Sequence, residues 1–343
     1  MELITSILLR TLALLLPLTA VSQATSSPRR GLCFVPNVTT PQDDRIWIQQ
    51  PSDLTWYYNY LQTPSVIFED RTQEDFEFVP MLWGPPDKRD NASTFEDAVK
   101  TLVQQGRNIG HVMTFNEPEM LEQWGGANMD PRFGAEVWIR NIPPLQSMGI
   151  KVGLPATAGT QESFTWLERF LRNCSEMVSG DGEKRNCTYD FVPFHHYGDF
   201  VSLASAFGQY TARFPDTPLW LTEFNYHNQS LEVTKDFYQW TTKWLDGLAF
   251  LKRYALFGAF RSDVSNVGPN AAMLNDQGQL TDIGVWYLGR NGHGEDPITK
   301  QRPDGNHQPS DATGRGLGEG PLGQGIATLG SVLAITFVLL IFF

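Results

Sequence analysis

Residues 111–120 read HVMTFNEPEM, an apolar run that ends in an amide, two carboxylates and a proline. Residues 111–115 have the composition of a buried β-strand. Pro118 then ends regular pairing, because a proline has no N–H group to donate to a neighbouring strand. A surface turn is one explanation for Glu117, the acid that follows the strand. The other is a functional carboxylate, and the rest of the chain decides between the two.

Eight short apolar runs recur along the chain, and the segments between them have the periodicity of helices. Strands that alternate with helices indicate βαβ units and a parallel sheet. Eight such units predict the α/β class and a single-domain (β/α)8 barrel, the TIM-barrel fold. An open doubly wound sheet would need a glycine-rich turn after its first strand, and FVPNVTTP (34–41) is not one. The runs are GLCFVPN (31–37), TWYYNY (55–60), FEFVPMLWG (76–84), HVMTFNEP (111–118), KVGLPATAG (151–159), FVPFHHYG (191–198), LWLTEFNYH (219–227) and YALFGAF (254–260).

Two of these runs place a glutamate where the expected strand ends. Glu117 falls at the end of the fourth strand and Glu223 at the end of the seventh. In a (β/α)8 barrel the active site lies at the carboxyl ends of the strands, so both acids are expected at the same opening of the barrel. Two such carboxylates suit glycoside hydrolysis, in which one protonates the leaving oxygen and the other attacks the sugar carbon. The alternative is that each glutamate only forms an ion pair at the rim of the fold.

The two ends of the chain are expected to lie outside the fold. Residues 1–24 have the apolar stretch and small residues of a secretory signal peptide. Residues 326–343 are mostly apolar, follow a polar glycine-rich stretch and have no Lys or Arg behind them, a pattern that favours a GPI-attachment signal over a transmembrane helix. Residues 291–325 contain nine Gly and four Pro and are predicted to be a flexible stalk. Residues 25–290 then form the catalytic domain.

Cysteines and glycosylation motifs agree with secretion. Cys174 and Cys187 bracket a polar loop and could close it as a disulfide, whereas Cys33 lies in an apolar run and is expected to be a buried free thiol. No Cys-His cluster has metal-ligand spacing, so neither a metal nor another cofactor is expected. N-x-S/T sequons, which are acceptors for N-glycosylation, occur at Asn37, Asn91, Asn173, Asn186 and Asn228.

The composition narrows the class of ligand. A formal net charge of −12 lacks the basic footprint of a nucleic-acid-binding protein. Ten Trp and ten Tyr suit a sugar-binding protein, because flat aromatic faces pack against pyranose rings, although most of these rings could belong to the core. Trp83 and Trp124 follow the third and fourth runs and are candidate sugar platforms, with core or loop packing as the alternative.

An ordered set of motifs resembles glycoside hydrolase family 128, whose members are β-1,3-glucanases. The resemblance covers about residues 30–289. FNEP (115–118), HHY (195–197) and WLTEF (220–224) are similar to the retaining (β/α)8 clan as a whole. The narrower similarity lies in RGLCFVPN (30–37), TWYYNY (55–60), LPATAG (154–159), RYALFGAF (253–260) and LTDIGVWYLG (280–289).

The resemblance implies a role for each matching position. Glu117 would be the general acid/base and Glu223 the nucleophile. Asn116 would bind the 2-hydroxyl of the sugar, Tyr197 would orient the nucleophile, and His195 would line the floor of the site. The chain departs from the family pattern in having His196 and Leu256 where aromatic residues are common, and Glu119 where aspartate is common.

The sequence therefore predicts a monomeric, retaining glycosidase that acts on β-1,3-glucan of a cell wall, held at the outer cell surface by a GPI anchor. One alternative is a glucan-binding wall or signalling protein with little or no turnover. Another is hydrolysis of a different β-linked polysaccharide, because a pair of carboxylates does not encode linkage.

Overall fold

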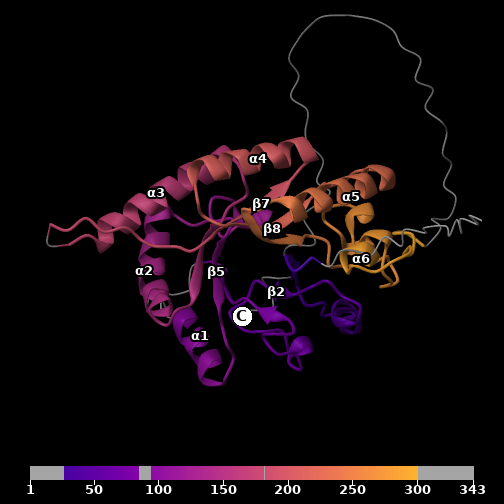
Figure 1. Ribbon diagram of the computed structural model, residues 1–343, viewed down its shortest axis with the longest axis horizontal. Coiled ribbons are helices and arrows are strands. Elements are labelled where there is room, and N and C mark those ends of the chain that lie inside the picture. The colour runs from indigo at the N-terminus through magenta and orange to yellow at the C-terminus, as the bar shows by residue number, and fades with distance from the viewer. Residues whose placement is uncertain (1–26, 85–93, 181, 300–343) are drawn as a thin grey trace, which may run out of the picture.

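The computed structural model describes residues 27–84, 94–180 and 182–299, and the strands in these ranges pair in parallel (Figure 1). Strands alternate with helices over most of this length, as the eight apolar runs predict. The strands are β1 (Arg30–Cys33), β2 (Trp56–Tyr58), β3 (Glu77–Phe78), β4 (Met81–Leu82), β5 (His111–Asn116), β6 (Lys151–Ala156), β7 (Val192–Tyr197), β8 (Leu219–Asn225) and β9 (Leu251–Leu256).

Five of the α-helices begin at polar side chains that accept backbone N–H groups of the first turn, which stabilises these ends. The capping residues of α2 to α6 are Asp130, Thr160, Asp199, Ser230 and Thr281. The helices are α1 (Thr94–Gln104), α2 (Pro131–Ser147), α3 (Gln161–Val178), α4 (Phe200–Arg213), α5 (Leu231–Gly247) and α6 (Asp282–Tyr287). Short 3-10 helices add η1 (Pro41–Ile48), η2 (Val66–Phe68), η4 (Glu122–Trp124), η5 (Ser262–Val264) and η6 (Pro269–Ala271).

The strands form two sheets, one in the order β3-β2-β1-β9-β8-β7 and the other in the order β4-β5-β6. The third apolar run therefore gives two short strands rather than the single strand expected from its sequence. Pro80 lies between β3 and β4 and has no N–H group to continue the ladder, while its carbonyl accepts the N–H of Met113. Parallel bridges join Gly153 to Phe191 and Thr157 to Phe194, between β6 and β7.

Side chains of the strands alternate between two hydrophobic clusters, because successive residues point to opposite faces of a sheet. In β5, Val112 packs in the large cluster shared with the helices, whereas its neighbour Met113 packs in a smaller one. The smaller cluster contains Cys33, Trp56 and Trp220. Both faces of these strands are thus buried, and polar side chains with a chemical role are left to the strand ends.

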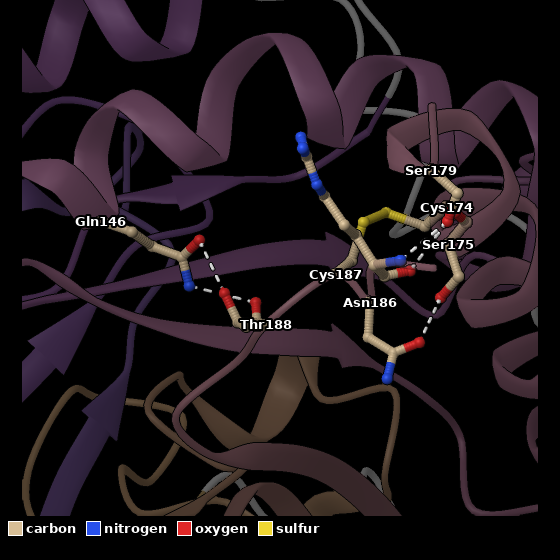
Figure 2. The surroundings of a disulfide bond; sticks show 8 residues. Gln146, Cys174, Ser175, Ser179, Asn186, Cys187 and Thr188 are labelled. Carbon is tan, nitrogen blue, oxygen red and sulfur yellow. Dashed lines mark hydrogen bonds between the residues drawn. A yellow bond between two sulfur atoms is a disulfide. The ribbon is translucent and has the colours of Figure 1, made fainter. Parts of the chain in front are cut away.

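A disulfide joins Cys174, on α3, to Cys187, the pairing that the sequence suggested, and Cys33 is a buried free thiol (Figure 2). Each bridged cysteine is the middle residue of a sequon. The two sequons also touch directly, because the Ser175 hydroxyl donates a hydrogen bond of 3.2 Å to the side-chain oxygen of Asn186. The bridge and this contact hold the end of α3 to the chain that leads into β7.

Removing the disulfide should destabilise the protein. Closing a loop of this size removes conformational entropy from the unfolded chain, so Cys174→Ser with Cys187→Ser should lower the free energy of unfolding by roughly 3 kcal/mol. Urea denaturation with and without reductant measures this. Reductant should lower the wild-type midpoint and leave that of the double variant unchanged. A wild-type midpoint that does not respond to reductant would contradict the prediction.

Four of the predicted glycosylation sites lie in the described residues. Asn186 is exposed, Asn173 is half-buried on α3, and Asn37 and Asn228 lie in the loops that follow β1 and β8. Asn91, the signal peptide (1–24), the GPI signal (326–343) and the stalk from residue 300 onward lie outside the described residues. Within those that are described, no helix combines the length and apolar character needed to cross a membrane.

The described chain stays attached to the body beyond α6. Glu295 forms a parallel bridge with Thr281. The Ser262 hydroxyl donates to the carbonyl of Pro297, and the N–H of Thr299 donates to a carboxylate oxygen of Asp276 at 3.2 Å. Contacts with the body therefore continue to Thr299, which places residues 291–299 against the loop that follows β9.

Candidate active site

Glu117 lies directly after β5 in an unusual backbone conformation. Its φ of +39° is in the left-handed region, which costs free energy for a residue with a side chain. Backbone hydrogen bonds hold it there: its N–H donates to Ala156 at 2.7 Å, and its carbonyl accepts from Met120 at 2.9 Å. The side chain is 11% exposed. A strained and buried acid is unlike the surface turn that the sequence left open.

Glu223 lies within β8, where it pairs in register with His195 of β7. Two tyrosine hydroxyls donate to its carboxylate, Tyr197 to Oε2 at 2.6 Å and Tyr60 to Oε1 at 2.9 Å. These bonds fix the carboxylate and favour its ionised form. Glu223 is buried, so its position is determined by protein contacts rather than by solvent.

His195 connects the two acids. Its Nδ1 lies 2.9 Å from Oε1 of Glu117 and 3.4 Å from Oε2 of Glu223. Burial by itself lowers the pKa of His195, but the carboxylates of Glu223 and Glu117 outweigh this and raise it. One ligand-type atom from each of the three residues lies within 4.8 Å of the others. This set also has the composition of a metal site, and the hydrogen bond between His195 and Glu117 accounts for part of its compactness.

The electrostatics of Glu223 reflect opposing effects. Burial raises the pKa of its carboxyl group above the ordinary value, His195 opposes the rise, and the neighbouring Glu117 adds to it. The hydrogen bonds from Tyr197 and Tyr60 also lower it. Burial and the carboxylate of Glu223 raise the pKa values of both tyrosines well above their usual range, so these hydroxyls stay protonated and act as donors.

Asn116 is held so that one side of its amide is free for a ligand. Its Nδ2 donates to the carbonyl of Gly125 at 2.9 Å, which fixes the orientation of the group. Its Oδ1 is buried and has no protein partner. A buried acceptor without a partner is costly unless something else satisfies it, and a sugar hydroxyl has the chemistry to do so.

The two predicted tryptophan platforms differ in their surroundings. Trp83 follows β4, is half-buried, and its carbonyl accepts the N–H of Asn116 at 2.7 Å, so its backbone is part of the site. Trp124, at the end of η4, is 61% exposed. Trp124 thus lies in the loop that follows Glu117, with its ring available to a ligand.

His195 and His196 point to opposite sides of β7, as alternation along a strand requires. His195 contacts the acids, whereas Nε2 of His196 lies 2.9 Å from the hydroxyl of Ser202 at the start of α4. At the end of β9, Leu256 is buried, and the next residue, Phe257, packs edge-on against Tyr197 with ring centroids 5.7 Å apart. An aromatic ring therefore packs against Tyr197, which holds Glu223, even though position 256 is a leucine.

Tyr58 and Tyr60 contribute to the site but were not singled out by the sequence. Tyr58 donates to the carbonyl of Thr222 at 2.9 Å and lies 3.4 Å from Glu223, close to Tyr60. Their spacing in TWYYNY could have indicated that both belong to the site, because residues two apart in a strand share a face. No feature of the sequence predicts the left-handed backbone of Tyr60, whose φ is +63°.

Two close, buried glutamates, one directly after β5 and one in β8, are an arrangement that suits glycoside hydrolysis. The comparison with known families agrees. Residues 31–287 match the family described as glycosyl hydrolase catalytic core, and the chain belongs to that family.

Solved structures with the same fold are glycoside hydrolase family 128 β-1,3-glucanases. An exo-β-1,3-glucanase of Aureobasidium namibiae has a TM-score of 0.61 and 18% identity, covering 77% of this chain and 96% of its own. An endo-β-1,3-glucanase of Pseudomonas viridiflava has a TM-score of 0.60 and 24% identity, covering 77% and 98%. At these identities the likeness is one of fold.

A relative from Schizosaccharomyces pombe, alkali-sensitive linkage protein 1, is 25% identical over 277 residues. The alignment covers 76% of this chain but only 44% of that protein. The chain thus spans less than half the length of this relative.

Proposed function

We propose that the protein is a retaining glycoside hydrolase that cleaves β-1,3-glucan. The observation that carries the proposal is the cluster of Glu117, His195 and Glu223, in which an oxygen of each carboxylate lies within 4.8 Å of the other. Retaining enzymes hold their carboxyl groups about 5–5.5 Å apart, whereas inverting enzymes leave about 6.5–9.5 Å for a water molecule. The short separation favours the retaining mechanism.

Each group has a step in this mechanism. Glu223, ionised and held by two tyrosines, attacks the anomeric carbon, while Glu117 donates a proton to the leaving oxygen. Glu117 then removes a proton from water, which displaces Glu223 from the glycosyl ester. His195 keeps the two carboxyl groups at a fixed separation, and the free Oδ1 of Asn116 accepts a hydrogen bond from the 2-hydroxyl of the sugar.

The choice of β-1,3-glucan rests on the solved structures of similar fold, which include a curdlan-specific exo-β-1,3-glucanase of Blastomyces gilchristii in complex with glucose. Incubating the purified protein with β-1,3-, β-1,4- and mixed-linkage glucans, and sizing the products, tests this choice. Release of oligosaccharides from the β-1,3-glucan alone is expected. Binding without any product supports the alternative, a glucan-binding protein on the same scaffold.

We also infer that the two sheets close into one eight-stranded barrel, with β3 and β4 acting as two halves of a single strand. They pair with β2 and β5 on their two sides. At the other junction, the two bridges between β6 and β7 support closure. Closure would bring the carboxyl ends of all the strands around one mouth, as the family fold requires.

Removing the hydroxyl of Tyr197 should change the pH dependence of turnover. The nucleophile must be ionised, and burial raises the pKa of Glu223, so the acid limb of kcat/KM should lie above the ordinary range of a glutamate. The Tyr197 hydrogen bond opposes that rise. Tyr197→Phe should therefore move the acid limb to higher pH, measured as kcat/KM across pH. An acid limb that stays in place or moves to lower pH would contradict this assignment.

We further propose that the protein is exported and held at the outer cell surface by a GPI anchor. The support is the signal-like stretch at residues 1–24 and the apolar tail at residues 326–343. Phosphatidylinositol-specific phospholipase should release the protein from intact cells, and its C-terminal peptide should end before residue 326. A membrane-bound protein whose peptide map still includes Phe343 would show that the tail is retained.

A further inference from the structure

A third acid, Glu119, lies two residues after Glu117 and reaches to the next connection along the chain. Its Oε1 accepts the N–H of Ala158 at 2.7 Å and also accepts the hydroxyl of Ser163. Ala158 follows β6 and Ser163 is in the first turn of α3. A single carboxylate oxygen thus ties the loop that bears Glu117 to the segment between β6 and α3.

The partner side of this contact is rigid. Ser163 is fully buried and takes part in a capping box, in which Thr160 accepts its N–H and its own hydroxyl accepts the N–H of Thr160 at 2.9 Å. Glycine at position 159 has a φ of +77°, and a side chain there would approach the carbonyl of His195. Glu119 is therefore attached to a segment that is itself fixed against the floor of the site.

The loop that bears Glu117 needs such a support, because the left-handed backbone of Glu117 is unfavourable in isolation. The loop closes on itself with backbone hydrogen bonds from Met129 to Pro118 at 2.8 Å and from Asn128 to Met120 at 3.0 Å. None of these bonds reaches α3. Two sets of side-chain hydrogen bonds make that connection: those of Glu119, two residues from Glu117, and that of the Trp166 indole, which donates to the carbonyl of Met129 at 2.6 Å at the far end of the loop.

We propose that Glu119 is a positioning residue for the acid/base: its carboxyl group fastens the loop of Glu117 to the start of α3 and thereby fixes where Glu117 delivers its proton. This inference rests on the proposed function. Burial raises the pKa of Glu119, and its Oε2 is buried without a partner. Glu119→Gln keeps the shape of the side chain and an oxygen that can accept both hydrogen bonds. This substitution therefore tests whether the hydrogen bonds or the charge of Glu119 matter.

The test compares two substrates that differ in their need for an acid. One is a β-1,3-glucan, whose leaving alcohol must be protonated, and the other is a dinitrophenyl β-glycoside of a β-1,3-linked disaccharide, whose leaving group departs without a proton. Glu119→Ala should lower kcat/KM on the glucan roughly 10²-fold, the cost of misplacing a catalytic group by about 1 Å. The loss on the dinitrophenyl substrate should be less than about tenfold, because the acid has no part in that step.

Three further variants sharpen the comparison. Glu119→Gln should retain most of the activity on both substrates. Glu122→Ala removes an exposed acid from the same loop and should match the wild type. Ser163→Ala removes one of the two donors to Glu119 and should give a smaller loss in the same direction, which keeps the test open if Glu119→Ala does not fold.

Equal losses on the two substrates, in Glu119→Ala or in Ser163→Ala, would overturn the proposal, because a general loss of folded protein does not depend on the leaving group. Activity of Glu119→Ala equal to that of Glu122→Ala would also overturn it. Either result leaves the proposed function in place as long as the wild type cleaves the glucan. A wild type that is inert on both substrates would instead remove the proposed function.

Discussion

Glu223→Gln is expected to abolish turnover of β-1,3-glucan, with a loss on the order of 10⁴-fold or more, because a neutral amide cannot form the glycosyl ester. The amide has nearly the same shape as the carboxylate: its oxygen can accept from one of Tyr197 and Tyr60, and its NH2 group can donate to the hydroxyl oxygen of the other. The loss should therefore appear without a matching fall in stability. Initial rates on the glucan, together with thermal unfolding of both proteins, measure the two effects separately.

The smaller variant Glu223→Ala identifies the role of the residue. It leaves space on the face of the sugar where the carboxylate would attack. Added azide can enter that space and displace an activated leaving group directly, which should give an α-glycosyl azide. The configuration of the product, read by nuclear magnetic resonance, decides the assignment. A β-glycosyl azide from this variant would mean that Glu223 is not the nucleophile.

The second large loss of activity is expected for Glu117→Ala. On glucan, kcat/KM should fall roughly 10²- to 10⁴-fold, the usual contribution of a general acid. On a dinitrophenyl β-glycoside, whose leaving group needs no proton, the glycosyl ester of Glu223 should still form. Azide, which needs no general base, should then release it and raise the steady-state rate. Two displacements at the same carbon give a β-glycosyl azide, as retention requires.

Glu223→Ala and Glu117→Ala serve as controls for one another, because each removes a buried carboxylate next to His195. Misfolding would respond to azide in neither variant, and the opposite configurations of the products cannot arise from a general loss of structure. A β product from Glu223→Ala and an α product from Glu117→Ala would exchange the two roles. Full activity on glucan in either variant would remove the mechanism and favour the glucan-binding alternative.

The sequence predicted the parts of the site that depend on strand position. Glu117 and Glu223 were expected at the carboxyl ends of two strands, and a (β/α)8 barrel brings such ends to one face. The opposite directions of His195 and His196 follow from alternation along a strand. The third run was less predictable: its apolar character hides the break at Pro80, where the chain changes from pairing with β2 to pairing with β5.

The contacts that tune the acids were not predictable from local pattern. Tyr60 reaches Glu223 across 163 residues, and Glu119 reaches Ser163 across 44. The periodicity of apolar residues predicts which face of a helix or strand a residue occupies. It does not predict partners that are far apart in the sequence, because these depend on how the loops are arranged in space. The left-handed backbone of Glu117 is likewise set by tertiary hydrogen bonds and carries no glycine or asparagine to mark it.

Hydrogen bonds hold the described chain against the body as far as Thr299, its last described residue. Asp276 and Ser262, which hold residues 297–299, belong to the connection after β9, at the same end of the strands as Glu117 and Glu223. The proposed GPI anchor would therefore be joined to the domain at the end of the strands that carries the two acids. With that anchor in place, the proposed enzyme would reach polymer that lies close to the membrane surface.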